Sequence, residues 1–335
     1  MHSNGHSANL HFAQTEDGWQ LALHRYAAGK KPSNRPPVVL IPGLGSNRHN
    51  MDFPIPRYSL ARFLYGLGYD VWAVDLRGMG LSTRPGLLNR WRYDWNFDDY
   101  ACKDVPAIYR TIKEVTHRES FHWIGHSLGG MLVLAAIERL GNQAAASAVT
   151  VASCVSAEDA PGFIKNLMQF DAALKYLPLI PAKQIAWLAA PVMKWIAPFY
   201  DNFYCRLDNM AEEVLKLGPR VAVDNVPVKL VLQIHAWYRE NHFRAVDGSG
   251  YSYLENLEKI TAPLMMIAGA ADGMTPVHDI RVGYDKVHSR PKKLTVFGKD
   301  HGHKSEYSHV DLLLGKNAPD EVYPVIADWI GRFNS

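Results

Sequence analysis

Short apolar runs alternate with longer stretches of helical periodicity along most of the chain. Residues 38–41 are apolar at every position, which is typical of a strand covered on both faces. In residues 104–115 the apolar positions recur every three or four residues, which predicts a helix packed on a sheet. The pattern predicts an α/β fold with a mostly parallel eight-stranded sheet flanked by helices. We expect its strands at residues 10–14, 20–25, 37–41, 70–75, 121–125, 146–152, 264–268 and 293–297.

This alternation stops between residues 155 and 246, where an aromatic-rich helical pattern takes over. We interpret residues 155–246 as a helical cap inserted into a core formed by residues 1–154 and 247–335. Most large apolar side chains of the insertion are expected to pack the cap, and some to line an apolar pocket beneath it. They are Phe163, Met168, Phe170, Tyr176, Trp187, Met193, Trp195, Phe199, Tyr200, Phe203 and Tyr204.

Composition narrows the class of protein. The chain has 335 residues, of which 47% are hydrophobic and 21% charged. Its net charge is +3 and it has no basic stripe, so we expect a globular protein with no nucleic-acid partner.

Three widely spaced cysteines form neither a disulfide framework nor a zinc pattern, and the first ten residues lack the apolar stretch of a secretory signal. We therefore expect a cytoplasmic protein. Prolines and lysines interrupt the most hydrophobic region, residues 180–199, so no membrane span is expected.

A nucleophile motif lies between the fifth predicted strand and the following helix. Gly125 and Gly129 flank Ser127 in the pattern G-x-S-x-G. The serine of such a motif sits on a strained turn that lifts its hydroxyl out of the sheet. The backbone N–H of Leu128 then lies at a helix N-terminus, where it can stabilise an oxyanion.

A serine hydroxyl needs a base and an acid that orients the base. Asp272 follows the seventh predicted strand and is the favoured acid, with Asp300 as the runner-up. Three histidines follow the last strand, and the residues alone leave the base open among His301, His303 and His309. We favour His309, which opens an amphipathic segment. The H-x-H pair in this loop is too loose a pattern for us to predict a metal site.

A second oxyanion donor is expected in the glycine-rich loop after the third predicted strand. Gly43 allows the backbone to bend there, and the N–H of Leu44 is the expected donor. No Lys-Ser or Lys-Thr pair follows, so the loop does not match a phosphate-binding loop.

Several stretches resemble the α/β-hydrolase fold and, more specifically, the acid lipase group, whose members hydrolyse triacylglycerols and sterol esters. The loop at residues 42–46 is similar to the H-G-L oxyanion loop of that group, with proline in place of histidine, and the sequence at residues 309–311 is similar to its H-x-D histidine. Further matches are Asp52, Pro54, residues 59–61, 68–72, 77–78, 95–101 and 104–107. The insertion has no match, and no secretion signal is present.

The resemblance implies Ser127 as nucleophile, Asp272 as acid, His309 as base, and Leu44 and Leu128 as oxyanion donors. Polyhydroxyalkanoate synthases resemble this pattern with cysteine as nucleophile, and epoxide hydrolases and dehalogenases of this fold would carry aspartate at position 127. We therefore predict a carboxylic ester hydrolase that acts through an acyl-enzyme on a hydrophobic or lipid-like ester, without a cofactor. An acyltransferase and a non-catalytic ligand-binding protein are the alternatives, and a homodimer stays open.

Overall fold

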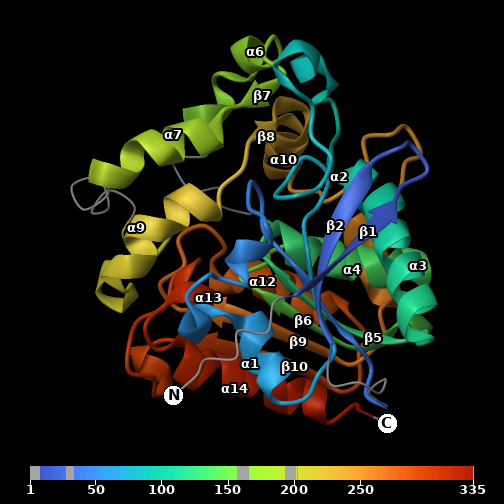
Figure 1. Ribbon diagram of the computed structural model, residues 1–335, viewed down its shortest axis with the longest axis vertical. Coiled ribbons are helices and arrows are strands. Elements are labelled where there is room, and N and C mark those ends of the chain that lie inside the picture. Colours follow the sequence, from blue (N-terminus) through green and yellow to red (C-terminus); the bar gives the residue numbers. More distant parts are fainter. Residues whose placement is uncertain (1–7, 28–33, 157–165, 193–200, 202, 335) are drawn as a thin grey trace.

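A computed structural model describes residues 8–27, 34–156, 166–192, 201 and 203–334, and its central element is one eight-stranded sheet (Figure 1). The strand order is β1-β2-β4-β3-β5-β6-β9-β10. The antiparallel pairs β1–β2 and β2–β4 lie at one edge, and all other pairs are parallel. The predicted fold class is confirmed.

The strands lie within one or two residues of their predicted bounds, since apolar runs this distinct are read directly from the sequence. They are β1 Asn9–Gln14, β2 Gln20–Tyr26, β3 Val38–Ile41, β4 Val71–Val74, β5 Phe121–His126, β6 Ala145–Val151, β9 Leu264–Gly269 and β10 Lys292–Phe297.

Both faces of the sheet are buried because alternate side chains of each strand enter different cores. On β3, Val39 and Ile41 belong to one hydrophobic core, whereas Val38 and Leu40 belong to the other. Helices α3 (Val105–Thr116), α4 (Leu128–Leu140) and α12 (Val277–Lys286) cover the first face. Helices α1 (Leu60–Gly66), α13 (Asp311–Leu314) and α14 (Ala318–Gly331) cover the second.

Local sequence sets the ends of three helices. Helix α3 is preceded by the short helix α2 (Phe97–Asp99) and a π-helical turn at Tyr100–Asp104. Helix α14 begins at Ala318, because Pro319 fits the first helical turn. Helix α4 ends at Gly141, where φ is 90°.

Between β6 and β9 the chain forms a group of helices, and those of them labelled in Figure 1 lie together on one side of the sheet. They are α6 Asp171–Leu174, α7 Ala182–Ala189, α9 Glu212–Val221, α10 Val228–Glu240 and α11 Tyr253–Asn256. The helical pattern missed a small antiparallel pair, β7 (Leu179–Ile180) with β8 (Val226–Pro227). The domain boundaries at residues 155 and 246 stay a prediction.

Three further expectations concern the same region and the cysteines. No helix in the described part of the chain is long and apolar enough to span a bilayer. All three cysteines are free thiols, and the cytoplasmic location stays a prediction. Phe163, Met193, Trp195, Phe199 and Tyr200 lie outside the described residues.

Candidate active site

Ser127 occupies a sharp turn between β5 and α4. Its φ of 53° and ψ of −123° are unusual for a residue with a side chain, and such a conformation costs about 1–3 kcal/mol. The surrounding structure holds it there, since the Ser127 N–H donates to the Val151 carbonyl at 2.8 Å. Ser127 is half-buried, whereas its neighbours His126 and Leu128 are buried. The turn therefore presents one hydroxyl at the end of the sheet.

The two glycines of the motif are required by close backbone packing. A Cβ on Gly125 would lie 2.2 Å from the Gly129 carbonyl oxygen, and a Cβ on Gly129 would lie 2.2 Å from the Ile41 carbonyl oxygen. Contacts this short are not tolerated, and both obstructing atoms belong to the backbone. The G-x-S-x-G spacing thus brings the start of α4 against both β5 and the end of β3.

Asp272 and His309 are joined by a buried hydrogen bond. The Nδ1–H of His309 donates to Asp272 Oδ2 at 3.0 Å, and the Thr275 hydroxyl donates to the same oxygen at 2.6 Å. The other carboxylate oxygen accepts the N–H groups of Met274 and Thr275, each at 2.9 Å. Burial raises the pKa of Asp272, but His309 and the bonds from His309 and Thr275 outweigh it and lower the pKa overall. Asp272 is held as a carboxylate that orients the imidazole.

The other residues considered for these roles lie elsewhere. His301 and Asp300 are exposed in the short helix Lys299–His301, and His303 packs its ring on Phe297 with 4.4 Å between the ring centroids. None of the three lines the cavity described next.

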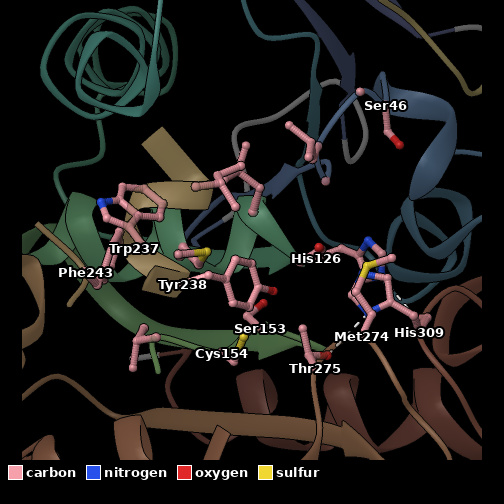
Figure 2. Close-up of a pocket in the computed structure, with 18 of the residues that line it drawn as sticks. Ser46, His126, Ser153, Cys154, Trp237, Tyr238, Phe243, Met274, Thr275 and His309 are labelled. Carbon is pink, nitrogen blue, oxygen red and sulfur yellow. Dashed lines mark hydrogen bonds between the residues drawn. The ribbon is translucent and has the colours of Figure 1, made fainter. Parts of the chain in front are cut away.

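A cavity of about 340 Å³ contains Ser127 and His309 in its lining, together with Leu44 and Leu128. Figure 2 shows His309 towards one end of this cavity and Trp237 and Phe243 towards the other. Among the described side chains, no hydrogen bond joins the Ser127 hydroxyl to the His309 ring. Such contacts often tighten only when substrate is bound.

The aromatic lining of this catalytic cavity comes mostly from positions that the sequence did not single out. Trp237 and Tyr238 belong to α10, and Phe243 follows it. Tyr204 is the one described residue of the predicted aromatic set that lines this cavity, whereas Trp187 is 60% exposed. Among the described residues, the face of α10 therefore contributes most of the aromatic wall.

The loop that carries Leu44 is held by a distant segment of the chain. Ser46 forms an antiparallel bridge with Val223, and the N–H of Asp224 donates to the Gly45 carbonyl at 2.7 Å. The buried Asp224 carboxylate also accepts the Asn47 side-chain amide at 2.9 Å. Neither the Leu44 N–H nor the Leu128 N–H donates to another described residue. Both stay available to a ligand.

His126 is a residue of this site that sequence reasoning missed, because it occupies a variable position of the motif. Its Nε2–H donates to the His309 carbonyl at 3.1 Å, and the two ring centroids are 4.9 Å apart (Figure 2). Its Nδ1 is buried without a partner among the described residues. Burial, reinforced by the nearby His309, lowers the pKa of His126 to about 3. The ring is therefore neutral and ties the backbone of His309 to the serine turn.

Metal-binding side chains do not gather in the described part of the molecule. No group of three His, Cys, Asp or Glu residues there could hold a metal ion. The chemistry available at this site is that of a hydroxyl, an imidazole, a carboxylate and two free N–H groups.

Comparison with known proteins identifies the fold family. The sequence model of the α/β hydrolase fold matches residues 36–306. Lipase lipl-1 of Caenorhabditis elegans is 35% identical over 133 residues, which cover 37% of this chain and 33% of that protein. The match thus spans about a third of that relative.

A weaker similarity extends over nearly the whole chain. The lysosomal acid lipase/cholesteryl ester hydrolase of Macaca fascicularis is 24% identical over 98% of this chain and 89% of its own length. A thermophilic esterase from Thermogutta terrifontis superposes with a TM-score of 0.65 at 15% identity, covering 98% of this chain and 100% of the esterase, which shows a shared fold. These matches confirm the predicted resemblance to lipases and esterases.

Proposed function

Because this chain belongs to the α/β-hydrolase fold family, we propose that it hydrolyses carboxylic esters through a Ser-His-Asp triad. Ser127 is the nucleophile, His309 the general base and acid, and Asp272 the group that orients His309. One observation carries this proposal. The strained turn at Ser127 lines the same cavity as His309, whose Nδ1 is hydrogen-bonded to the buried carboxylate of Asp272.

The reaction proceeds in two halves. In the first, Ser127 Oγ attacks the ester carbonyl carbon while its proton passes to His309 Nε2. The resulting oxyanion accepts hydrogen bonds from the N–H groups of Leu44 and Leu128. His309 then returns the proton to the ester oxygen as the C–O bond breaks, and the alcohol leaves. In the second half, water attacks the acyl-enzyme by the same route and releases the carboxylic acid and free Ser127.

The cavity favours an apolar acyl group. Its wall beyond Ser127 is formed by side chains such as Met131, Ile234 and Trp237, and binding sites of this kind recognise the apolar body of a ligand through contact area. The names of the relatives, which include lipases and a cholesteryl ester hydrolase, support a lipid-like neutral ester as substrate.

The direct test is hydrolysis of 4-nitrophenyl butyrate by the wild type and by Ser127→Ala. The variant is expected to lose about 10⁴-fold or more in kcat, because the nucleophile and base act as a unit. Ser289→Ala is the control, since this serine is also buried but lies outside the cavity, and its hydroxyl makes only a 3.4 Å bond to the Ile260 carbonyl. A Ser127→Ala protein that keeps a tenth of the wild-type rate would refute the proposal.

A further inference from the structure

A second apolar cavity of about 270 Å³ adjoins the catalytic cavity. The two share Ser46, Tyr204 and Val223 in their linings, so the cavities meet at these residues. None of the described residues that line the second cavity has a charged side chain, and its few polar residues include Ser46 and Asn50. Its apolar wall includes Ala186, Val214, Ala222, Val310 and Leu314.

The second cavity lies on the His309 side of the catalytic centre. Val310 follows His309 directly and lines the second cavity, and its N–H donates to the Tyr204 carbonyl at 2.9 Å. The Tyr204 ring stands 6.3 Å from the His309 ring. Figure 2 shows Ser46 on the same side of the pocket as His309, opposite Trp237 and Phe243. The two cavities therefore extend from the catalytic residues in different directions.

This position matters because the two halves of an ester have different neighbours during the reaction. The acyl carbon bonds to Ser127, and its oxygen faces the Leu44 and Leu128 N–H groups. The leaving oxygen must take a proton from His309, so the alcohol half has to lie on the histidine side. Of the two cavities, the one that continues past His309 is the second.

Helix α7 contributes one residue to the lining of each cavity. Ala182 lines the catalytic cavity, whereas Ala186, one turn later, lines the second cavity. The helix is anchored, because Lys183 Nζ donates to Asp224 at 2.8 Å and the Lys183 N–H donates to the Asn225 side chain at 3.1 Å. The small side chain of alanine at both positions leaves room for a ligand.

We propose that the second cavity binds the alcohol half of the substrate, which makes this chain selective for neutral esters with apolar groups on both sides of the carbonyl. This inference rests on the proposed esterase function. An uncharged alkyl alcohol of several carbons fits the apolar lining. A cationic alcohol does not fit, because none of the described residues that line the cavity supplies a carboxylate to replace the water lost from the charge.

The first test uses the wild type and a series of butyrate esters from ethyl to hexyl, with butyrylcholine as the charged comparison. Each added methylene that enters the cavity is expected to raise kcat/KM about fourfold. Butyrylcholine is expected to fall below ethyl butyrate. A kcat/KM that stays flat from ethyl to hexyl would overturn the inference, whereas Ser127-dependent cleavage of ethyl butyrate would still support the esterase function.

The second test uses two matched variants on α7. Ala186→Trp fills the second cavity and is expected to lower kcat/KM for hexyl butyrate about 100-fold, with ethyl butyrate within threefold of the wild type. Ala182→Trp fills the catalytic cavity and is expected to lower kcat/KM more for ethyl octanoate than for ethyl butyrate. The ratio of kcat/KM for hexyl butyrate to that for ethyl butyrate is expected to change little. Equal effects of both variants on both series would overturn the assignment, and if either variant misfolds, the wild-type series decides.

Discussion

Replacing Asp272 by asparagine tests the orientation of the catalytic imidazole. In the wild type one carboxylate oxygen accepts two backbone N–H groups, each at 2.9 Å, and the other accepts His309 Nδ1–H at 3.0 Å and the Thr275 hydroxyl at 2.6 Å. An asparagine keeps its carbonyl oxygen on the backbone N–H groups. Its NH₂ group then faces His309, where two donors would meet.

The imidazole resolves this conflict by moving its proton from Nδ1 to Nε2. His309 then has no lone pair for the proton of Ser127, and kcat is expected to fall about 10⁴-fold, equivalent to about 5 kcal/mol in the barrier. Stability is expected to fall less, by about 1.5–3 kcal/mol, which is the range for one hydrogen bond to a charged group. Catalysis and stability are thus affected to clearly different degrees.

The assay compares kcat for 4-nitrophenyl butyrate and the free energy of urea unfolding in Asp272→Asn and Asp300→Asn. Asp300, the runner-up acid, is exposed and lies outside the cavity, so its variant is expected to match the wild type in both measurements. A folded Asp272→Asn protein with kcat within tenfold of the wild type would show that Asp272 does not orient the catalytic imidazole, and a large loss of kcat in Asp300→Asn would point to Asp300 instead.

Three further predictions follow from the same structure. Asp224→Ala should lower kcat about 10- to 100-fold with a smaller change in KM, because Asn47 and the oxyanion loop lose the carboxylate that anchors them. Asp224→Asn keeps a hydrogen-bond acceptor for Asn47 and should keep most of the wild-type kcat. Gly129→Ala should lower the Tm by several degrees, since its Cβ would lie 2.2 Å from the Ile41 carbonyl, and an unchanged Tm would contradict the geometry. Burial raises the folded-state pKa of Glu138 from 4.5 to about 8. Between these two pH values its carboxyl is protonated in the folded state and ionised in the unfolded state, so the free energy of unfolding falls as the pH rises. The Tm advantage of Glu138→Gln over the wild type should therefore grow from pH 5 to pH 9.

The sequence was sufficient for the parts of the fold that depend on local pattern. The apolar run of β3 and the glycine spacing around Ser127 reflect constraints within a few residues, namely burial on both faces and a turn without room for side chains. The same holds for Gly141, which ends α4 with a positive φ.

Features that depend on distant contacts could not be predicted in this way. The contact between Asn47 and Asp224 joins residues 177 positions apart, and no local signal marks either of them. The choice among three late histidines was likewise open, because only the tertiary position of Asp272 distinguishes His309 from His301 and His303. The apolar wall provided by α10 has an ordinary helical pattern that gives no sign of a cavity.

If His309 activates the Ser127 hydroxyl for covalent attack, a fluorophosphonate probe reacts rapidly with that hydroxyl, and mass spectrometry of the intact protein and its peptides locates the adduct. We expect one adduct per chain, on Ser127, with labelling lost in Ser127→Ala and strongly slowed in His309→Ala. Rapid labelling at another residue, or none at Ser127 in protein that hydrolyses esters, would contradict the assignment of Ser127 as the nucleophile.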